Sequence, residues 1–263
     1  MTFRYKITIE YDGTNYIGWQ KQEYETKDGY SGKRSIGGVL QEVIFSLTQE
    51  KIELFASGRT DAGVHAIAQI AHFDSTKKFQ PHQIIFGLNN YLLNHKNSSG
   101  KSGSGIVITD CEIVDENFHS RFSAKKRHYF YRIINRKAPL VIEKNRALHV
   151  ANKLNISAMQ EAAQYLVGEH DFSAFRDAEC QAKSAIKTID EINISQNADE
   201  IKVTIAAKSF LHHMVRNIVG TLIWVGSDKI NACEVKNILL SKNRLNSGPN
   251  VAACGLYFYR TDY

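Results

Sequence analysis

The sequence has few cysteines, and no two of them form a CxxC pair. The four lie far apart, at Cys111, Cys180, Cys233 and Cys254. Zinc knuckles and dithiol redox centres place two cysteines within a few residues of each other, so this spacing predicts neither. We expect reduced thiols, most of them buried.

Long apolar runs are also missing. No segment approaches the roughly 20 apolar residues that a membrane-spanning helix needs. The first thirteen residues, MTFRYKITIEYDG, alternate polar and apolar side chains, which predicts a strand and not a signal peptide. We therefore expect a soluble, cytoplasmic protein without a membrane partner.

The chain lacks a strong excess of either charge. Its 33 Lys and Arg residues outnumber 27 Asp and Glu residues, which gives a net charge of +6 over 263 residues. This moderate excess is compatible with a polyanionic partner but does not require one. A hydrophobic content of 43% is that of a folded protein with one large core or two smaller ones.

Hydrophobic periodicity predicts an α+β fold. Helical spacing of apolar residues predicts helices at 36–47, where Ser35 can cap the start, and at 81–92, 156–167 and 209–226. Alternating segments predict strands at 52–56, 64–73, 106–114, 127–135, 191–195 and 201–208. Because strand, helix and strand occur in both parts of the chain, we expect two α/β halves, residues 1–110 and 111–263, that share an antiparallel sheet.

Two polar segments, 16–35 and 96–105, are expected to be exposed loops. A third, SGRTDAGVHA at 57–66, lies between two predicted strands. Its glycines suit a turn, but a turn does not require the charged pair Arg59 and Asp61. A carboxylate there can act as a nucleophile if a cation keeps it ionised and water is excluded. From this segment alone, a structural turn and a catalytic site both remain open.

Two other motifs suggest enzyme classes that the sequence does not support. IEYDGTNY at 9–16 is similar to the phosphatase signature DxDGT, but Glu10 replaces the first aspartate and no helix follows, which favours a strand-ending turn. Residues 61–63, DAG, are similar to the DTG of aspartic proteases. Those enzymes need two such aspartates, and this chain has one copy.

The histidines do not predict a metal site. Histidine ligands on a helix usually lie at i and i+4, whereas His212 and His213 are adjacent and would point about 100° apart on a helix. His65 and His72 lie far from them in the sequence. On the same predicted helix, Arg216 falls well off the apolar stripe, where a solvated cation is the simplest interpretation.

The segment AKKRHYFYR at 124–132 mixes basic and aromatic residues on a predicted strand. Alternation places Arg127, Tyr129 and Tyr131 on one face. Aromatic rings beside cations can hold unstacked bases and phosphates, although an ordinary amphipathic strand has the same pattern.

Together, these segments resemble the TruA family of tRNA pseudouridine synthases along almost the whole chain. The matching stretches are YDGTNYIGWQKQ (11–22), SGRTDAGVHAIAQIAHF (57–73), NFHSRFSAKKRHYFYRI (117–133), GEHDFSAFR (168–176), FLHHMVRNIVGTLIWVG (210–226) and GLYF (255–258). The resemblance implies the pseudouridine synthase fold, with helices on one side of the shared sheet and a central cleft. It implies conversion of uridine to pseudouridine at positions 38–40 of the tRNA anticodon stem-loop by a homodimer, without metal or organic cofactor.

The resemblance also assigns roles to residues. Asp61 matches the catalytic aspartate, which attacks either C1′ or C6, and Arg216 matches the basic residue that pairs with it. Tyr129 matches the tyrosine that stacks on the target base and is the candidate for taking the C5 proton. Arg59 matches an arginine that holds the nucleotide outside the stack, and Leu256 a residue that lines the uracil pocket.

Basic loops at 21–34 and 125–132, the second including Arg127, would contact phosphates. The loops at 23–34 and 96–105 look longer than in shorter bacterial members, and SGPNVAACGLYF at 247–258 departs from the usual sequence before GLYF. A synthase of the same family acting on other tRNA or small RNA uridines, or a non-catalytic RNA-binding protein, remains an alternative.

Overall fold

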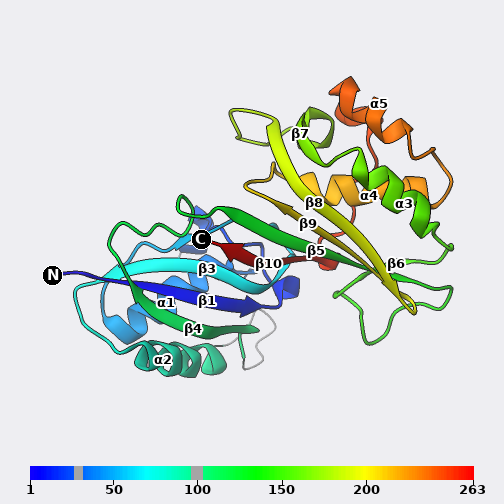
Figure 1. The fold of residues 1–263 in the computed structure, drawn as a ribbon. Helices are drawn as coiled ribbons and strands as arrows, with labels where there is room; N and C mark the ends of the chain where they lie inside the picture. Colours follow the sequence, from blue (N-terminus) through cyan, green and yellow to red (C-terminus); the bar gives the residue numbers. More distant parts are fainter. Residues whose placement is uncertain (27–31, 96–102) are drawn as a thin grey trace. The chain divides into compact units, whose positions relative to one another are not determined.

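A computed structural model describes residues 1–26, 32–95 and 103–263, and five α-helices and ten strands are assigned among them. The predicted α+β class is therefore confirmed. The chain forms two compact units, residues 1–125 with 258–263 and residues 126–257 (Figure 1). The units differ from the halves expected from the sequence, because residues 110 and 111 lie inside strand β4.

The first unit is built on antiparallel strands. β1 (Phe3–Tyr11) pairs with β4 (Ile106–Val114) on one side and with β3 (His65–Ser75) on the other. The short strand β2 (Phe55–Ala56) also pairs with β3, as does β10 (Leu256–Asp262). The expected strand at 52–56 is therefore reduced to its last two residues.

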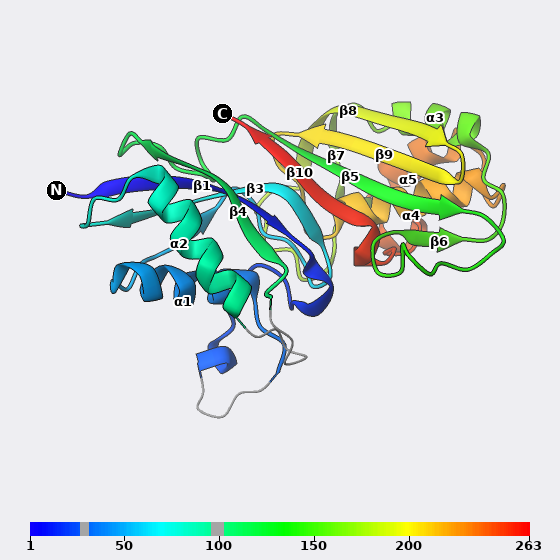
Figure 2. The same ribbon diagram turned by 90° about the horizontal axis from the view of Figure 1, so that it is seen from below.

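Two helices cover the sheet of the first unit (Figure 2). α1 (Ile36–Thr48) begins at the predicted cap, where the hydroxyl of Ser35 accepts a hydrogen bond from Gly38 N at 3.1 Å. α2 (Pro81–Asn94) buries Ile84, Leu88 and Leu92. Both helices follow the predicted periodicity, because their apolar stripes face the core.

The second unit has an antiparallel meander with helices packed on it. Its strands run in the order β5 (Lys126–Asn135), β9 (Glu200–Ala207), β8 (Ile186–Asn197) and β7 (Gly168–Asp171), and β6 (Leu148–Val150) pairs parallel to β5. The helices are α3 (Ile156–Gln164), α4 (Met214–Gly226) and α5 (Glu234–Ser241). No helix among the described residues is long and apolar enough to cross a membrane.

The helix expected at 209–226 starts later than its periodicity predicts. His213 adopts a left-handed conformation with φ of 61°, and Met214 N donates to Leu211 O at 3.1 Å, so a turn replaces the first helical turn. The expectation that His212 and His213 lie on the helix was therefore wrong. The helix expected at 156–167 ends at Gln164.

The two loops expected from the sequence are described only in part. Residues 27–31 of the first and 96–102 of the second lie outside the described residues. Within the described portion of the first loop, Glu25 is buried and accepts hydrogen bonds from Ser35 N at 2.8 Å and Ser35 Oγ at 2.9 Å. This part of the segment is therefore anchored to the start of α1.

Candidate active site

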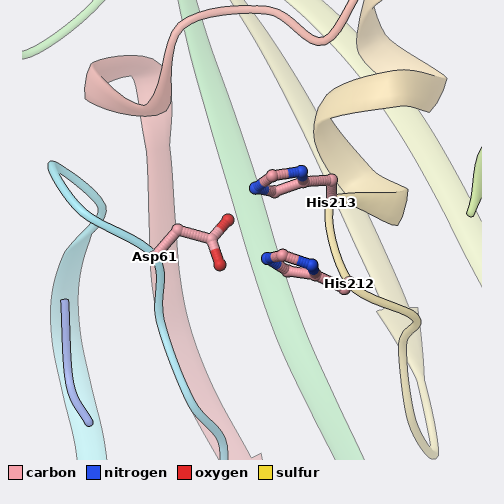
Figure 3. Close-up of side chains that lie close together, drawn as sticks. All are labelled: Asp61, His212 and His213. Atoms are coloured by element: carbon pink, nitrogen blue, oxygen red, sulfur yellow. The ribbon is translucent and has the colours of Figure 1, made fainter. Parts of the chain in front are cut away.

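Asp61 lies on the segment that leads into β3 (Figure 3). Its carbonyl accepts a hydrogen bond from Val64 N at 3.2 Å, and Gly63 within this turn has φ of 79°. Trp19 N donates to the carbonyl of Thr60 at 3.0 Å, and Asp61 forms an isolated β-bridge with Gly18. The backbone on both sides of the aspartate is therefore fixed by the polypeptide chain itself.

Two glycines of the segment YDGTNYIGW, residues 11–19, allow this close approach of the backbone to the Asp61 turn. Gly18 has φ of 103°, and a Cβ atom there would lie 2.6 Å from the carbonyl oxygen of Thr60. A Cβ atom on Gly13 would collide with the carbonyl oxygen of Val64. The segment YDGTNYIGW therefore packs closely against the turn that carries Asp61. The DGT sequence at its start thus has a structural role.

Side chains hold the same turn from the core. Ser57 Oγ donates to Gln69 Oε1 at 2.6 Å, and Gln69 Nε2 donates to Gly58 O at 2.7 Å. The hydroxyls of Tyr11 and Thr60 lie 2.8 Å apart, and burial raises the pKa of Tyr11 above its ordinary value. Gln69 is fully buried on β3, between the apolar stretches 66–68 and 70–71. Its polarity in that setting was the available signal, and the sequence interpretation missed it.

A buried histidine contacts the supporting segment. His65 Nδ1 lies 3.2 Å from Asp12 Oδ1 and 3.1 Å from Gly13 N. The hydrogen bond to His65, together with hydrogen bonds from Thr14, holds the pKa of Asp12 well below its usual range. We infer that Asp12 is ionised at neutral pH and stabilises the turn below Asp61.

Arg59 and Asp61 differ in exposure although one residue separates them. Arg59 is exposed, Thr60 points into the core, and Asp61 is half-buried. The exposed guanidinium of Arg59 can therefore reach a large ligand, whereas the carboxylate of Asp61 is partly shielded from water.

In the second unit, Tyr129 lies on β5 opposite Ile205 of β9. It is half-buried, and its ring meets Phe210 edge-on with centroids 5.0 Å apart. Arg127, two residues earlier, is 9% exposed, and its guanidinium donates to the carbonyl of Lys208. Arg127 is therefore more deeply buried than a freely solvated phosphate contact would be.

Arg216 lies in the first turn of α4 and is half-buried. Its Nε donates to the carbonyl of Val251 at 2.7 Å. The interpretation of Arg216 as a simply solvated cation is therefore wrong, because one edge of its guanidinium is bound to the backbone of a neighbouring loop.

His212 and His213 stack immediately before α4 (Figure 3). Their ring centroids are 3.8 Å apart with an interplanar angle of 30°. The expected divergence of about 100° assumed a helix, but His213 is left-handed and the two rings lie against each other with a tilt of 30°.

Leu256 opens β10 and is buried, with 6% of its surface exposed. The preceding Gly255 packs against Tyr131, because a Cβ atom there would lie 2.5 Å from the tyrosine ring. The hydroxyl of Tyr131 donates to Ala252 O at 2.6 Å. These contacts explain locally why a glycine precedes the leucine in GLYF.

The predicted residues fall into two sets. Asp61 and Arg59 belong to the first unit, on one turn. Tyr129, Arg216 and Leu256, like Arg127, belong to the second. Each set is therefore ordered within its own unit.

Comparison with known proteins identifies relatives along the full chain. A family model described as tRNA pseudouridine synthase matches residues 7–113 and 162–263. A protein named tRNA pseudouridine synthase A from Ehrlichia chaffeensis is 46% identical over 260 residues, covering 99% of this chain and 100% of the relative. A second, of the same name, from Orientia tsutsugamushi is 41% identical over 299 residues, covering 99% of each chain.

Similarity to solved structures is weaker. A chain of the crystal structure of a Cbf5-Nop10-Gar1 complex shares 9% identity with a TM-score of 0.34, covering 96% of this chain and 57% of that chain. Similarity at this level supports no conclusion about function. The family model and the full-length relatives are sufficient by themselves: the chain belongs to the tRNA pseudouridine synthase family.

Proposed function

We propose that this protein converts uridine to pseudouridine in tRNA, at positions 38–40 of the anticodon stem-loop, with Asp61 as the nucleophile and no metal or organic cofactor. The observation that carries the proposal is the similarity to proteins named tRNA pseudouridine synthase A, at 41% and 46% identity over 99% of the chain. The built turn that presents Asp61 supports it from the structure.

The reaction exchanges one glycosidic bond for another. The bond between C1′ and N1 breaks, uracil rotates while it is held, a bond forms between C1′ and C5, the C5 proton leaves, and N1 takes up a proton. The carboxylate of Asp61 attacks C1′ or C6 and its bond to that carbon breaks again before the product leaves, and either attack needs an ionised, partly shielded carboxylate. The hydroxyl of Tyr129 takes the C5 proton while its ring stacks on the base.

The remaining residues bind and orient. Arg216 pairs with Asp61 and keeps it ionised, and Leu256 provides an apolar wall for uracil. The exposed guanidinium of Arg59 holds the target nucleotide outside the stack, which offsets an unstacking cost of a few kcal/mol. Arg127 contributes positive charge near the RNA backbone.

We also propose that this protein shares the domain arrangement and the homodimeric state of the family. The two halves of the catalytic unit share one antiparallel sheet with helices on one side, and the active-site cleft lies between them. The protein acts as a homodimer on tRNA in the cytoplasm. Salt dependence offers a direct check on RNA binding, since affinity for tRNA should fall steeply as salt rises.

The test of the nucleophile is Asp61→Asn, measured by tritium release from tRNA labelled at C5 of uridine. We expect turnover to be abolished while tRNA binding in a filter assay is largely kept, because the nucleophile and the phosphate contacts are different residues. Turnover close to that of the wild type would rule out the nucleophilic role.

The test of the substrate is a pseudouridine map of tRNA from a strain that lacks the gene. We expect positions 38–40 to remain uridine and other pseudouridines to persist. Full modification at these positions in the deletion strain would contradict the site assignment and favour other tRNA or small RNA uridines.

A further inference from the structure

The imidazole of His213 is bound by an aspartate from a distant segment of the second unit. Asp177 follows the short helix η3 (Ser173–Phe175), and its Oδ2 lies 2.7 Å from Nδ1 of His213. A carboxylate at this distance calls for a hydrogen on Nδ1, which fixes the tautomer of the neutral ring. The other oxygen of Asp177 accepts from Glu179 N at 3.1 Å. The carboxylate is therefore anchored on both sides.

His213 occupies a conformation that needs support. Its φ of 61° is unfavourable for a residue with a side chain, so its surroundings must hold it there. The bond to Asp177 and the stacked ring of His212 provide that support. Its carbonyl accepts from Asn217 N at 2.9 Å, which starts α4. The conformation of His213 thus sets the first turn of the helix that carries Arg216.

A single dipeptide links His213 to Arg216. The side-chain nitrogen Nδ2 of Asn250 lies 2.9 Å from Nδ1 of His213, and the carbonyl of the next residue, Val251, accepts from Arg216 Nε at 2.7 Å. Asn250 Oδ1 is buried and has no hydrogen-bond partner among the described residues. Rotation of this carboxamide by half a turn presents Oδ1 to the Nδ1 hydrogen, which Asp177 Oδ2 and Asn250 Oδ1 then share as two acceptors.

We propose that Asp177, His213 and Asn250 are positioning residues that fix the guanidinium of Arg216 for the reaction. Asp177 orients the imidazole, the imidazole holds Asn250, and the adjoining carbonyl of Val251 holds Nε of Arg216. This inference rests on the role proposed above for Arg216. It also gives a purpose to Asn250 and Val251, which lie in the segment before GLYF.

Fixing this guanidinium has a kinetic consequence. An arginine side chain has many rotamers, and displacement of a functional group by about 1 Å can lower a rate by as much as 100-fold. Because Arg216 is proposed to pair with Asp61 and not with the tRNA backbone, loss of positioning should lower kcat more than it raises KM.

The first experiment compares Asp177→Asn with Asp171→Asn in steady-state pseudouridylation of tRNA. Asp171 is a matched control, because its Oδ1 accepts from Ser173 N at 3.0 Å in the same type of turn, and its ion pair is with Lys242 at 3.1 Å. For Asp177→Asn we expect kcat to fall roughly ten-fold with KM within about two-fold. For Asp171→Asn we expect wild-type kcat. Equal kcat in both variants would overturn the proposal.

A double-mutant cycle separates positioning from general structural damage. If Asp177 acts through Arg216, Asp177→Asn should lower kcat by less than about two-fold in an Arg216→Gln background. A second full ten-fold loss there would overturn the proposal. If Arg216→Gln itself keeps wild-type kcat, the role of Arg216 in the proposed function fails instead.

A spectroscopic readout tests the positioning without any turnover. In the wild-type protein, the hydrogen-bonded Nε–H of Arg216 should give a protected ¹H–¹⁵N signal, assigned by its loss in Arg216→Gln. We expect this signal to exchange rapidly in Asp177→Asn and in Asn250→Ala, and to persist in Asp171→Asn. A protected signal in both Asp177→Asn and Asn250→Ala would overturn the proposal even if activity were lost.

Discussion

The segments that carry Asp61 and Arg216 are held by different means. Around Asp61, main chain meets main chain directly, through the bridge to Gly18 and the bond from Trp19 N to Thr60 O. Around Arg216, side chains make them, and the nearby Arg244 adds a bond from Nη2 to Asn217 Oδ1 at 2.9 Å. One site is built by close backbone approach and the other by a polar network.

The segments around Asp61 and Arg216 should be sensitive to different substitutions. A backbone-held turn tolerates most side-chain changes but depends on glycines at the points of closest approach. A network of side chains depends on each polar partner, because the loss of one leaves another buried group unsatisfied. The contrast predicts which variants damage which unit.

The largest effect is expected from Gly13→Ala in the first unit. The added Cβ would collide with the carbonyl oxygen of Val64, which is backbone and cannot move away cheaply. We expect the free energy of unfolding, measured in urea, to fall by about 3 kcal/mol. Gly103→Ala is the control, because φ there is +94° but no atom of the described residues lies within 4 Å of the added Cβ, so about 1 kcal/mol is expected. Equal losses would show that close approach is unimportant.

Mild acid should weaken the first unit before it affects the Asp177 network. Burial lowers the pKa of His72 from 6.5 to about 4, so between these values the unfolded chain binds a proton that folded His72 does not. The unfolding free energy should therefore fall as pH drops from 6.5 towards 4, by about 2 kcal/mol. Asp177 has a lowered pKa, chiefly through the hydrogen bond from Glu179 and then His213, so its contribution is lost only below the ordinary aspartate range.

This pH dependence is checked by urea unfolding at pH 7 and pH 4.5. His72→Gln should flatten the profile between the two values, and the exposed His82 offers a control, since His82→Gln should leave the profile unchanged. An unchanged profile in His72→Gln would assign the acid sensitivity to other groups.

A smaller loss is expected when the side-chain support of the Asp61 turn is removed. Gln69→Leu keeps a similar volume but removes the acceptor of the Ser57 hydroxyl hydrogen and the Nε2 donor to the carbonyl of Gly58. We expect about 1.5 kcal/mol of destabilisation in urea unfolding. The exposed Gln160, whose Nε2 donates to Ile194 O at 2.8 Å, is the control, and Gln160→Leu should cost under about 0.5 kcal/mol.

The smallest effect is expected from Arg244→Lys in the second unit. Arg244 donates to Ser247 Oγ at 2.8 Å, Gly248 O at 2.9 Å and Asn217 Oδ1 at 2.9 Å, a fork that an ammonium group cannot reproduce. We expect about 1 kcal/mol of destabilisation, measured by urea unfolding. The control is Lys236→Arg, on the exposed side of α5. If Arg244→Lys lowers the free energy of unfolding no more than this control does, the forked hydrogen bonds of Arg244 add no stability.

The sequence predicts the backbone-held site better than the network. Periodicity and the cap at Ser35 locate α1, and the crowded motif at 57–66 identifies the turn that carries Asp61. These features are local, so short stretches of sequence contain them. The start of α4 is less easily predicted, because apolar residues at helical spacing extend back to Leu211. The helix begins only after His213, which is left-handed and contacts the distant residues Asp177 and Asn250.

Dependence on distant contacts also explains why Asp177, Asn250 and Gln69 were not predicted from the sequence. Asp177 and Asn250 come from segments far from α4 in the sequence, and nothing in either segment indicates a shared histidine partner. Gln69 could be suspected because it is polar among apolar neighbours on β3, but its contacts with the Asp61 turn depend on how β3 pairs with β2.

Residues 258–263 belong to the first unit, although the whole second unit precedes them in the chain. Within the first unit, Thr261 Oγ1 donates to Ser57 Oγ at 3.0 Å and Tyr263 OH donates to Ser120 O at 2.7 Å. A ribosome releases the polypeptide from its N-terminus onwards, so residues 1–125 emerge without these partners. The turn that presents Asp61 therefore gains its hydrogen bond from Thr261 only after the whole second unit has been translated. A truncated chain that lacks residues 258–263 would form this turn without that bond.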